Sequence, residues 1–176
     1  MIYQKSGFAY PNFNRYNSIF EYMFVFSKGN VKTFNPICDV KNTYFGDKVA
    51  RLHGNRNKEG DVVANSAYKH NGGKIVKECG MRTNIWKYST GGGNVTTEEY
   101  AYKHPAMFPE QLAKDHILSW SNPNDLVVDI FAGSGTTLKM AKLMGRKFIG
   151  FEISKEYVDI CLERIKQNSL LEVINA

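Results

Sequence analysis

The residues with the clearest chemical potential lie in the stretch DIFAGSGTT, residues 129–137. An apolar run, LVV, precedes this stretch, and a helix-like segment, TLKMAKLMGRK, follows it. The pattern therefore predicts a strand that ends in a glycine turn and continues into a helix. Glycines allow a tight turn and a close approach of a ligand to the backbone, and the N–H groups at a helix start favour a negative group. We expect this turn to bind a ligand.

Two common ligand classes fit the turn poorly. The phosphate loop of nucleoside triphosphatases ends in Gly-Lys-Ser/Thr, whereas Gly135 is followed by two threonines. A dinucleotide site, such as one for a nicotinamide cofactor, needs a third glycine three residues after the second, and Leu138 occupies that position.

A nucleoside that carries no pyrophosphate fits better. Glu152 lies 19 residues after Gly133, at the end of the next predicted strand, where a carboxylate can accept both hydroxyls of a ribose. Asp129 precedes the turn and could contact an ammonium group. A ligand with a ribose, an amino-acid tail and no phosphate matches S-adenosylmethionine. The alternative is that both acids are solvated residues at strand ends.

The elements that must position these residues follow from periodicity. Pro109 is predicted in the first turn of a helix, whose apolar face is formed by Leu112, Ala113, His116, Ile117 and Trp120. LVVDIF and KFIGFEI are predicted strands. TTLKMAKLMG is a helix closed by Gly145, and SKEYVDICLERIKQ is a helix with Ser154 as N-cap. Alternating strands and helices with short links predict parallel strands, so residues 104–176 form a Rossmann-like half.

The first 103 residues differ in character. Residues 19–26, IFEYMFVF, predict a buried strand. Residues 29–103 are rich in Gly and Asn and hold twelve Lys or Arg against seven Asp or Glu, whereas residues 104–176 hold eight against nine. Basic and aromatic loop residues can hold phosphates and stack on bases, so a polyanion is expected to contact the first part. The alternative is a basic face that only water contacts.

Composition bounds the class of protein. With 176 residues, 43% hydrophobic and 23% charged, the chain is of globular type. No apolar run approaches the roughly 18 residues of a membrane span, and no signal peptide is visible. The three cysteines, Cys38, Cys79 and Cys161, are far apart, which predicts reduced thiols in a cytoplasmic protein with no metal site.

The order of three motifs, HPAMFPEQLAKDHI, DIFAGSGTT and GFEIS, closely resembles the end of the beta-group site-specific DNA amino-methyltransferases, which methylate adenine N6 or cytosine N4. RTNIW, MIYQK and FEYMFVFSKG resemble the strands after that family's catalytic motif. The resemblance implies an α/β, Rossmann-like, S-adenosylmethionine-dependent methyltransferase fold with a loop-rich basic insertion. Residues 1–28 would be strands of the core, 29–103 the target recognition region, and 104–176 the cofactor-binding half.

The resemblance also implies roles for single residues. Asp129 would lie beside the amino group of the cofactor and Glu152 would hold the ribose. The methionine side would be lined by Phe131, Gly133, Gly135 and Thr136, and the pocket would be closed by His104, Pro105, Ala106 and Phe108. His104 could instead be a capping or packing histidine, and Phe131 a core residue. Candidate phosphate contacts to double-stranded DNA are Arg56, Lys58, Arg82 and Lys103, which could also be merely solvated.

The family's catalytic motif, Asp/Asn/Ser-Pro-Pro-aromatic, holds the flipped base and accepts hydrogen bonds from its amine. The sequence contains no Pro-Pro pair, so no catalytic residue is expected in this chain. In this family the motif precedes the recognition region, which places it upstream of Met1. Its absence predicts an incomplete sheet, open between the strands of LVVDIF and MIYQK, that pairs with a missing N-terminal portion or a second copy. The alternative is a non-catalytic DNA-binding remnant or regulatory fragment.

Overall fold

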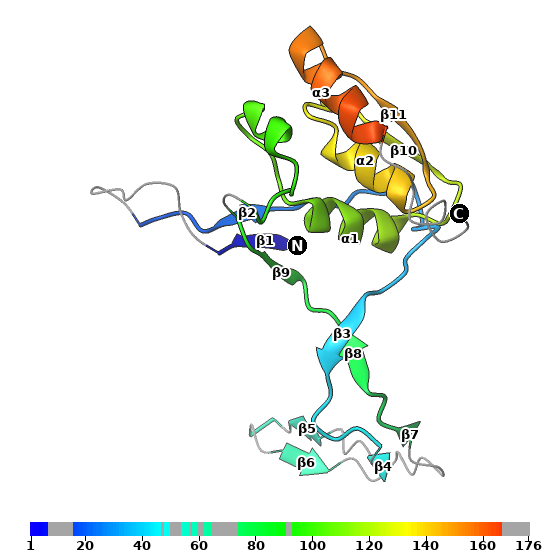
Figure 1. Cartoon of the computed structure of the whole chain (residues 1–176). Helices are drawn as coiled ribbons and strands as arrows, with labels where there is room; N and C mark the ends of the chain where they lie inside the picture. Colours follow the sequence, from blue (N-terminus) through cyan, green and yellow to red (C-terminus); the bar gives the residue numbers. More distant parts are fainter. Residues whose placement is uncertain are drawn as a thin grey trace. The chain divides into compact units, whose positions relative to one another are not determined.

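The computed structural model describes residues 1–6, 16–46, 48–49, 54–56, 58–59, 62–64, 74–90 and 93–166. The chain divides into two compact units (Figure 1). The larger unit comprises Met1–Ile37 and Thr83–Ala176, and the smaller unit is Cys38–Arg82.

A βαβ unit followed by a helix forms the C-terminal part of the larger unit. It consists of β10 (Leu126–Asp129), α2 (Thr136–Leu143), β11 (Lys147–Gly150) and α3 (Lys155–Ile165). The two strands are parallel, with Leu126 opposite Lys147. Gly145 takes a φ of 73° after α2, and the Ser154 hydroxyl accepts a hydrogen bond from the Tyr157 N–H at the start of α3. These findings confirm the predicted order of the elements, the parallel pairing of the strands, the end of α2 at Gly145 and the start of α3 at Ser154.

Helix α1 (Glu110–Trp120) packs against α2 (Figure 1). Its apolar face forms a core with α2 that contains Ala113, Ile117, Met140 and Ala141. Pro109 is the N-cap residue of α1, and the 3-10 helix η1 (Glu99–Lys103) precedes it. The predicted helix and its buried face are thus confirmed.

A second sheet in the same unit has the order β2-β1-β9. Strand β1 (Ile2–Lys5) pairs antiparallel with β2 (Phe20–Tyr22) and parallel with β9 (Ile85–Tyr88). Its core consists of Tyr3, Trp86 and, from α1, Leu112. The strand predicted at MIYQK is therefore present, a strand begins within RTNIW, and FEYMFVFSKG forms a strand only over its first three residues.

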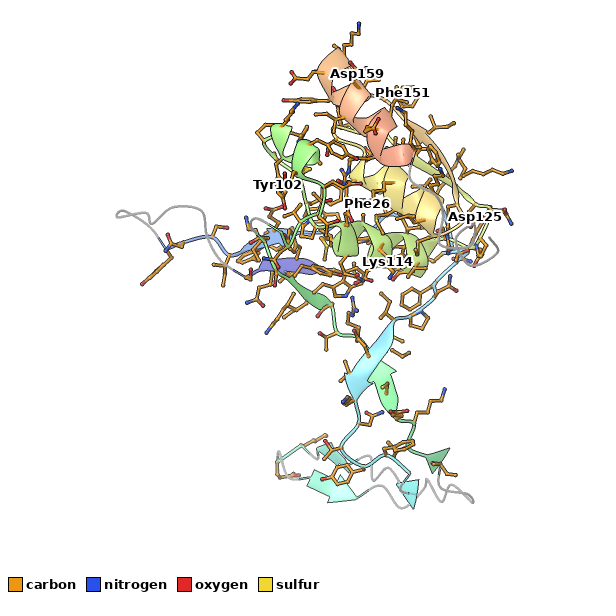
Figure 2. All side chains as sticks on the ribbon, viewed as in Figure 1. Phe26, Tyr102, Lys114, Asp125, Phe151 and Asp159 are labelled. Carbon is orange, nitrogen blue, oxygen red and sulfur yellow. The ribbon has the colours of Figure 1, made fainter. Side chains whose placement is uncertain are left out.

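The prediction that residues 19–26 form a buried strand is wrong. Strand β2 covers only Phe20–Tyr22; Tyr22 is 66% exposed and Phe26, labelled in Figure 2, is 88% exposed. The physical reason is the position of β2 at the edge of its sheet, because among the described strands it pairs with β1 alone. Its aromatic rings contact each other instead, with ring centroids 5.3 Å apart for Phe20 and Tyr22 and 6.0 Å apart for Tyr22 and Phe24.

The two sheets of the larger unit are separate. Among the described strands, β10 pairs only with β11, so the other edge of β10 has no strand beside it. The gap that the sequence predicts between the strands of LVVDIF and MIYQK stays a prediction, because it concerns more than the described residues. An unpaired edge leaves a row of backbone donors and acceptors available to another strand.

The described residues of the smaller unit form three two-stranded antiparallel ribbons. They pair β3 (Cys38–Lys41) with β8 (Cys79–Met81), β4 (Lys48–Val49) with β7 (Lys74–Ile75), and β5 (Gly54–Arg56) with β6 (Val62–Ala64). The predicted recognition region, residues 29–103, is longer than this unit. Residues 29–37 and 83–103 belong to the larger unit, where β9 pairs with β1.

Over the described ranges, no helix is both long and apolar enough to cross a membrane. The three cysteines form no disulfide, and Cys161 is buried.

The contact of α2 with β11 gives a prediction about stability. A Cβ on Gly150 would collide with Leu138 Cδ1 and lie 3.1 Å from Ala132 Cβ. We expect Gly150→Ala to lower the free energy of unfolding by about 1–3 kcal/mol through overpacking. Leu138→Ala alone should cost about 2–5 kcal/mol because it leaves a cavity. The double variant should lose roughly 0.5–3 kcal/mol less than the sum. Additive losses in urea melts would contradict this packing.

Candidate functional site

The glycine turn connects β10 to α2. Gly133 and Gly135 have φ values of 51° and 79°, the left-handed region that side chains disfavour. Gly135 is the N-cap residue of α2, and its N–H donates to the Ala132 carbonyl at 2.7 Å. The turn therefore requires glycine at both positions for reasons of backbone conformation.

Close packing inside the protein also requires these glycines. A Cβ on Gly133 would lie 2.9 Å from His104 Nε2, and a Cβ on Gly135 would collide with Cys161 Sγ. From the sequence, these glycines are expected to allow both a tight turn and the approach of a ligand to the backbone. In the structure, side chains of the same chain make the close approach.

Glu152 links the end of β11 to the glycine turn. One carboxylate oxygen accepts the Gly133 N–H at 2.9 Å, and the other accepts the Ser154 N–H at 2.8 Å. The hydrogen bonds from the backbone N–H groups, that of Ser154 first, lower the pKa of Glu152 below its usual value. The carboxylate is therefore ionised at neutral pH and keeps lone pairs for further donors. Asp129, at the end of β10, accepts the Phe131 N–H at 3.0 Å.

Apolar side chains next to these carboxylates face solvent. Phe131 is 84% exposed and Ile153 is 101% exposed. Both line an open cavity of about 910 Å³, together with Glu152 and Phe151, which is labelled in Figure 2. The alternative in which Phe131 belongs to the core is thus wrong. An ionised carboxylate between exposed apolar groups suits a ligand with hydroxyls and a flat apolar ring.

His104 brings its segment against the turn. Its ring lies edge-on to Tyr157, with centroids 4.4 Å apart, and its Nδ1 accepts the Ala106 N–H at 3.3 Å. These are packing and capping contacts, as in the alternative role that the sequence allows for this histidine. Pro105 and Ala106 are exposed.

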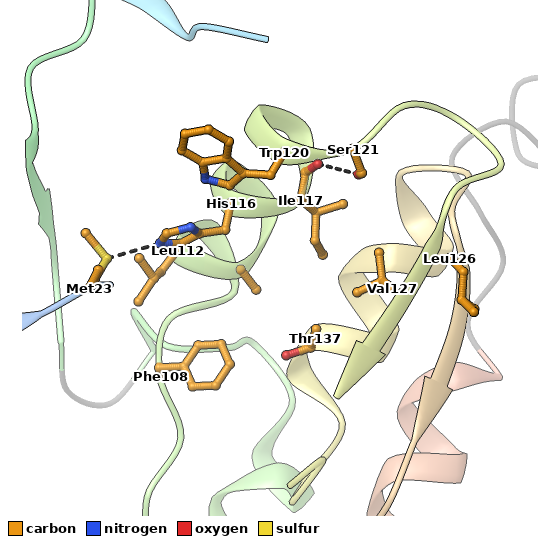
Figure 3. A pocket seen from close by; sticks show the side chains of 11 residues that line it. Met23, Phe108, Leu112, His116, Ile117, Trp120, Ser121, Leu126, Val127 and Thr137 are labelled. Carbon is orange, nitrogen blue, oxygen red and sulfur yellow. Dashed lines mark hydrogen bonds between the residues drawn. The ribbon is translucent and has the colours of Figure 1, made fainter. Parts of the chain in front are cut away.

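Phe108 lines a second, largely apolar cavity of about 500 Å³ (Figure 3). The other walls come from α1, β10, Met23 and Thr137 of α2. His116 Nε2 lies 3.1 Å from Met23 Sδ, and burial lowers the pKa of His116. The cavity thus adjoins β10, which has an unpaired edge among the described strands. Sequence reasoning did not predict it, because its walls come from segments distant in sequence.

Thr136 is turned toward the interior. It is buried, and its hydroxyl accepts a hydrogen bond from the Arg164 guanidinium at 2.9 Å. The Thr136 hydroxyl thus has an internal partner, and its predicted role at the methionine side of a ligand stays a prediction.

Four charged side chains form a network behind the turn, in which Glu98, Lys139 and Arg164 are buried and Glu110 is half-buried. Sequence reasoning missed all four. A usable signal was present in α3, where Arg164 follows the buried Ile160 and Cys161 at the spacing of a core position. Burial alone would raise the pKa of Glu110, but its hydrogen bonds and charge contacts, led by Lys139, outweigh that effect and lower it.

The four predicted DNA contacts are divided between the units. Lys103 is exposed at the end of η1 in the larger unit. In the smaller unit, Lys58 is exposed and Arg56 ends β5. Arg82 donates from Nε to Asp39 at 2.8 Å, an ion pair that competes with any phosphate. In the part of the chain that the structure describes, no cluster of His, Cys, Asp or Glu could hold a metal ion.

The chain belongs to the DNA methylase family whose members are described as N6 and N4 methyltransferases, since that family's model matches residues 1–163. It is 49% identical over 171 residues to the orphan methyltransferase M.BamHII of Bacillus amyloliquefaciens, a match that covers 97% of this chain and 63% of the relative. It is 38% identical over 128 residues to the DNA adenine methyltransferase YhdJ of Escherichia coli, covering 72% of this chain and 41% of the relative. The chain thus spans less than two thirds of these relatives' lengths.

Among solved structures, the cytosine-N4-specific PvuII DNA methyltransferase matches with a TM-score of 0.44 and 31% identity, over 54% of this chain and 36% of that one. The M1.HpyAVI complex with S-adenosylmethionine matches with a TM-score of 0.41 and 32% identity, over 49% and 41% of the two chains.

The geometry of Glu152 gives a prediction about cofactor affinity. Glu152→Gln removes the charge of the side chain that the sequence predicts as the acceptor of the ribose hydroxyls, so binding of S-adenosylhomocysteine should weaken by roughly 10- to 100-fold in calorimetry. Because the pKa of Glu152 is lowered, the wild-type affinity should persist as pH falls from 7 to about 4.3, the ordinary Glu value, and decline below it.

The matched control is Glu99→Gln, which removes an exposed carboxylate in η1 and should bind like the wild type. Equal affinities of Glu152→Gln and the wild type would show that Glu152 does not contact the ligand.

Proposed function

We propose that this chain is the cofactor-binding and target-recognition part of a cytoplasmic, site-specific DNA methyltransferase. The whole enzyme transfers a methyl group from S-adenosylmethionine to the exocyclic amine of a base in double-stranded DNA. The observation that carries the proposal is the ionised Glu152 carboxylate beside the glycine turn, in a chain of the DNA methylase family. Adenine N6 is favoured over cytosine N4, in line with the name of the Escherichia coli relative.

The residues around the turn fit the proposed cofactor. Glu152 has unused lone pairs for the ribose hydroxyls, and Phe131 and Ile153 offer exposed apolar surface to a purine. Asp129 has one oxygen on the Phe131 N–H and a second for an ammonium group. When bound, the cofactor supplies an electrophilic methyl group on a sulfonium. The residues of this chain bind and orient it.

The group that holds the target amine comes, in this proposal, from outside the 176 residues. The sequence has no Pro-Pro pair and so lacks the family's catalytic motif. The edge of β10 without a strand beside it, among the described residues, and the adjoining apolar cavity of about 500 Å³ support docking of a complementary segment. A second copy of the chain is the other occupant that such an edge could accept.

Complementation tests this proposal. The purified chain is mixed with the part of the 49%-identical relative that lies outside the matched 171 residues, and transfer of labelled methyl groups to double-stranded DNA is measured. We expect transfer only when both parts are present, and none from either alone. Absence of cofactor binding by the mixture would refute the proposal.

Sequencing the source DNA upstream of the Met1 codon adds an independent check for the motif.

The smaller unit, Cys38–Arg82, is the proposed contact to DNA. It holds nine Lys or Arg against five Asp or Glu. Lysine contacts to phosphates release counterions, so binding should weaken as salt rises.

We expect Lys58→Ala to weaken DNA binding similarly across sequences and to lower the slope of log affinity against log salt by about 1. Fluorescence anisotropy over a salt series measures both quantities. Lys166→Ala is the control, because it removes an exposed lysine of the other unit that pairs with Glu163. An unchanged slope for Lys58→Ala would exclude a phosphate contact of this side chain.

The absence of a Pro-Pro pair favours a second candidate function, a DNA-binding remnant or regulatory fragment that transfers nothing. This candidate predicts salt-sensitive DNA binding that does not respond to S-adenosylmethionine. Methyl transfer in the complementation experiment would eliminate it.

A further inference from the structure

A fully buried guanidinium contacts the glycine turn from the protein interior. Arg164, at the end of α3, is 0% exposed. Its NH1 group donates to the Ser134 carbonyl at 3.0 Å, to the Ser134 hydroxyl at 3.0 Å and to the Thr136 hydroxyl at 2.9 Å. Ser134 lies between the two glycines of left-handed conformation, so the peptide that defines the turn is held by this one side chain.

The other donors of Arg164 reach the segments that flank the turn. Its Nε donates to Glu98 at 2.7 Å and its NH2 donates to Glu110 at 2.6 Å. Glu98 is the N-cap residue of η1, and Glu110 is the first residue of α1, so the segment that carries His104 lies between them. Lys139 of α2 bridges the same two carboxylates at 3.1 and 2.9 Å.

Burial makes this arrangement costly to disturb. A charge removed from water is tolerated only when its donors are satisfied, and loss of one partner leaves the others unpaired. Rotation of the Ser134 peptide would leave NH1 without its backbone acceptor. Movement of the His104 segment away from the turn would separate Glu98 and Glu110 from Arg164.

We propose that Arg164 is a positioning residue for the cofactor site, which fixes the glycine turn in its binding conformation and holds it against the His104 segment. This inference rests on the proposed function and adds a residue that none of the expected contacts includes. Arg164 acts through Ser134, Thr136, Glu98 and Glu110, and it does not touch the ligand. A lysine could keep the charge but could not reach all of these acceptors at once, because the planar fork of arginine presents five donors.

The test compares two buried arginines in the full chain. Arg164→Lys should speed amide exchange of residues 133–137 about tenfold in the unliganded protein and weaken S-adenosylhomocysteine binding to a similar degree. Arg146→Lys is the matched control: Arg146 is also buried, and it donates to Ser121 at 2.7 Å and to Met144 at 2.6 Å, outside the turn. It should lower the melting temperature and leave exchange in the turn and affinity at wild-type values.

The inference would be overturned if folded Arg164→Lys showed the same amide exchange rate in the turn as the wild type. It would also be overturned if Arg164→Lys and Arg146→Lys changed exchange in the turn equally. If Arg164→Lys does not fold, Ser134→Ala serves instead, since it removes one acceptor and leaves NH1 two others; it should speed exchange in the turn about threefold. Failure of the wild type to bind S-adenosylhomocysteine would count against the proposed function, while the exchange measurement would still decide the role of Arg164.

Discussion

The buried guanidinium of Arg164 has no access to water, so its donors must find hydrogen-bond acceptors within the protein. This requirement constrains the segments of the larger unit that surround it. Arg164 reaches four partners that belong to the glycine turn, α2, η1 and α1. A guanidinium in that position is stable only if all of these segments stay in place, because each donor left unpaired in a buried site costs free energy. The network therefore makes the segments around the candidate site depend on one another.

The site has a closed side and an open side as a result. On the closed side, His104 and Cys161 pack so tightly on Gly133 and Gly135 that no side chain fits there. On the open side, Glu152 presents an ionised carboxylate between exposed apolar groups. This division separates the contacts that shape the turn from the groups that remain exposed to solvent.

Other surfaces of the larger unit lack cover among the described residues. The rings of Phe20, Tyr22 and Phe24 contact one another and are exposed, β10 has one edge without a strand, and an apolar cavity adjoins β10. Exposed apolar surface and open strand edges together characterise sites of association.

β10, α2, β11 and α3 could be predicted from local pattern alone, because strand periodicity, Gly145 and the Ser154 cap act over a few residues. The family and the proximity of Glu152 to the turn could be predicted as well, since parallel strands end at the same edge of a sheet. The pairing of side chains, in contrast, depends on contacts between segments that are distant in the chain. Arg164 meets Glu98 across 66 residues and Arg82 meets Asp39 across 43. The prediction that residues 19–26 are buried was wrong for the same reason. Burial depends on neighbours that are distant in sequence, and a local pattern does not specify those neighbours.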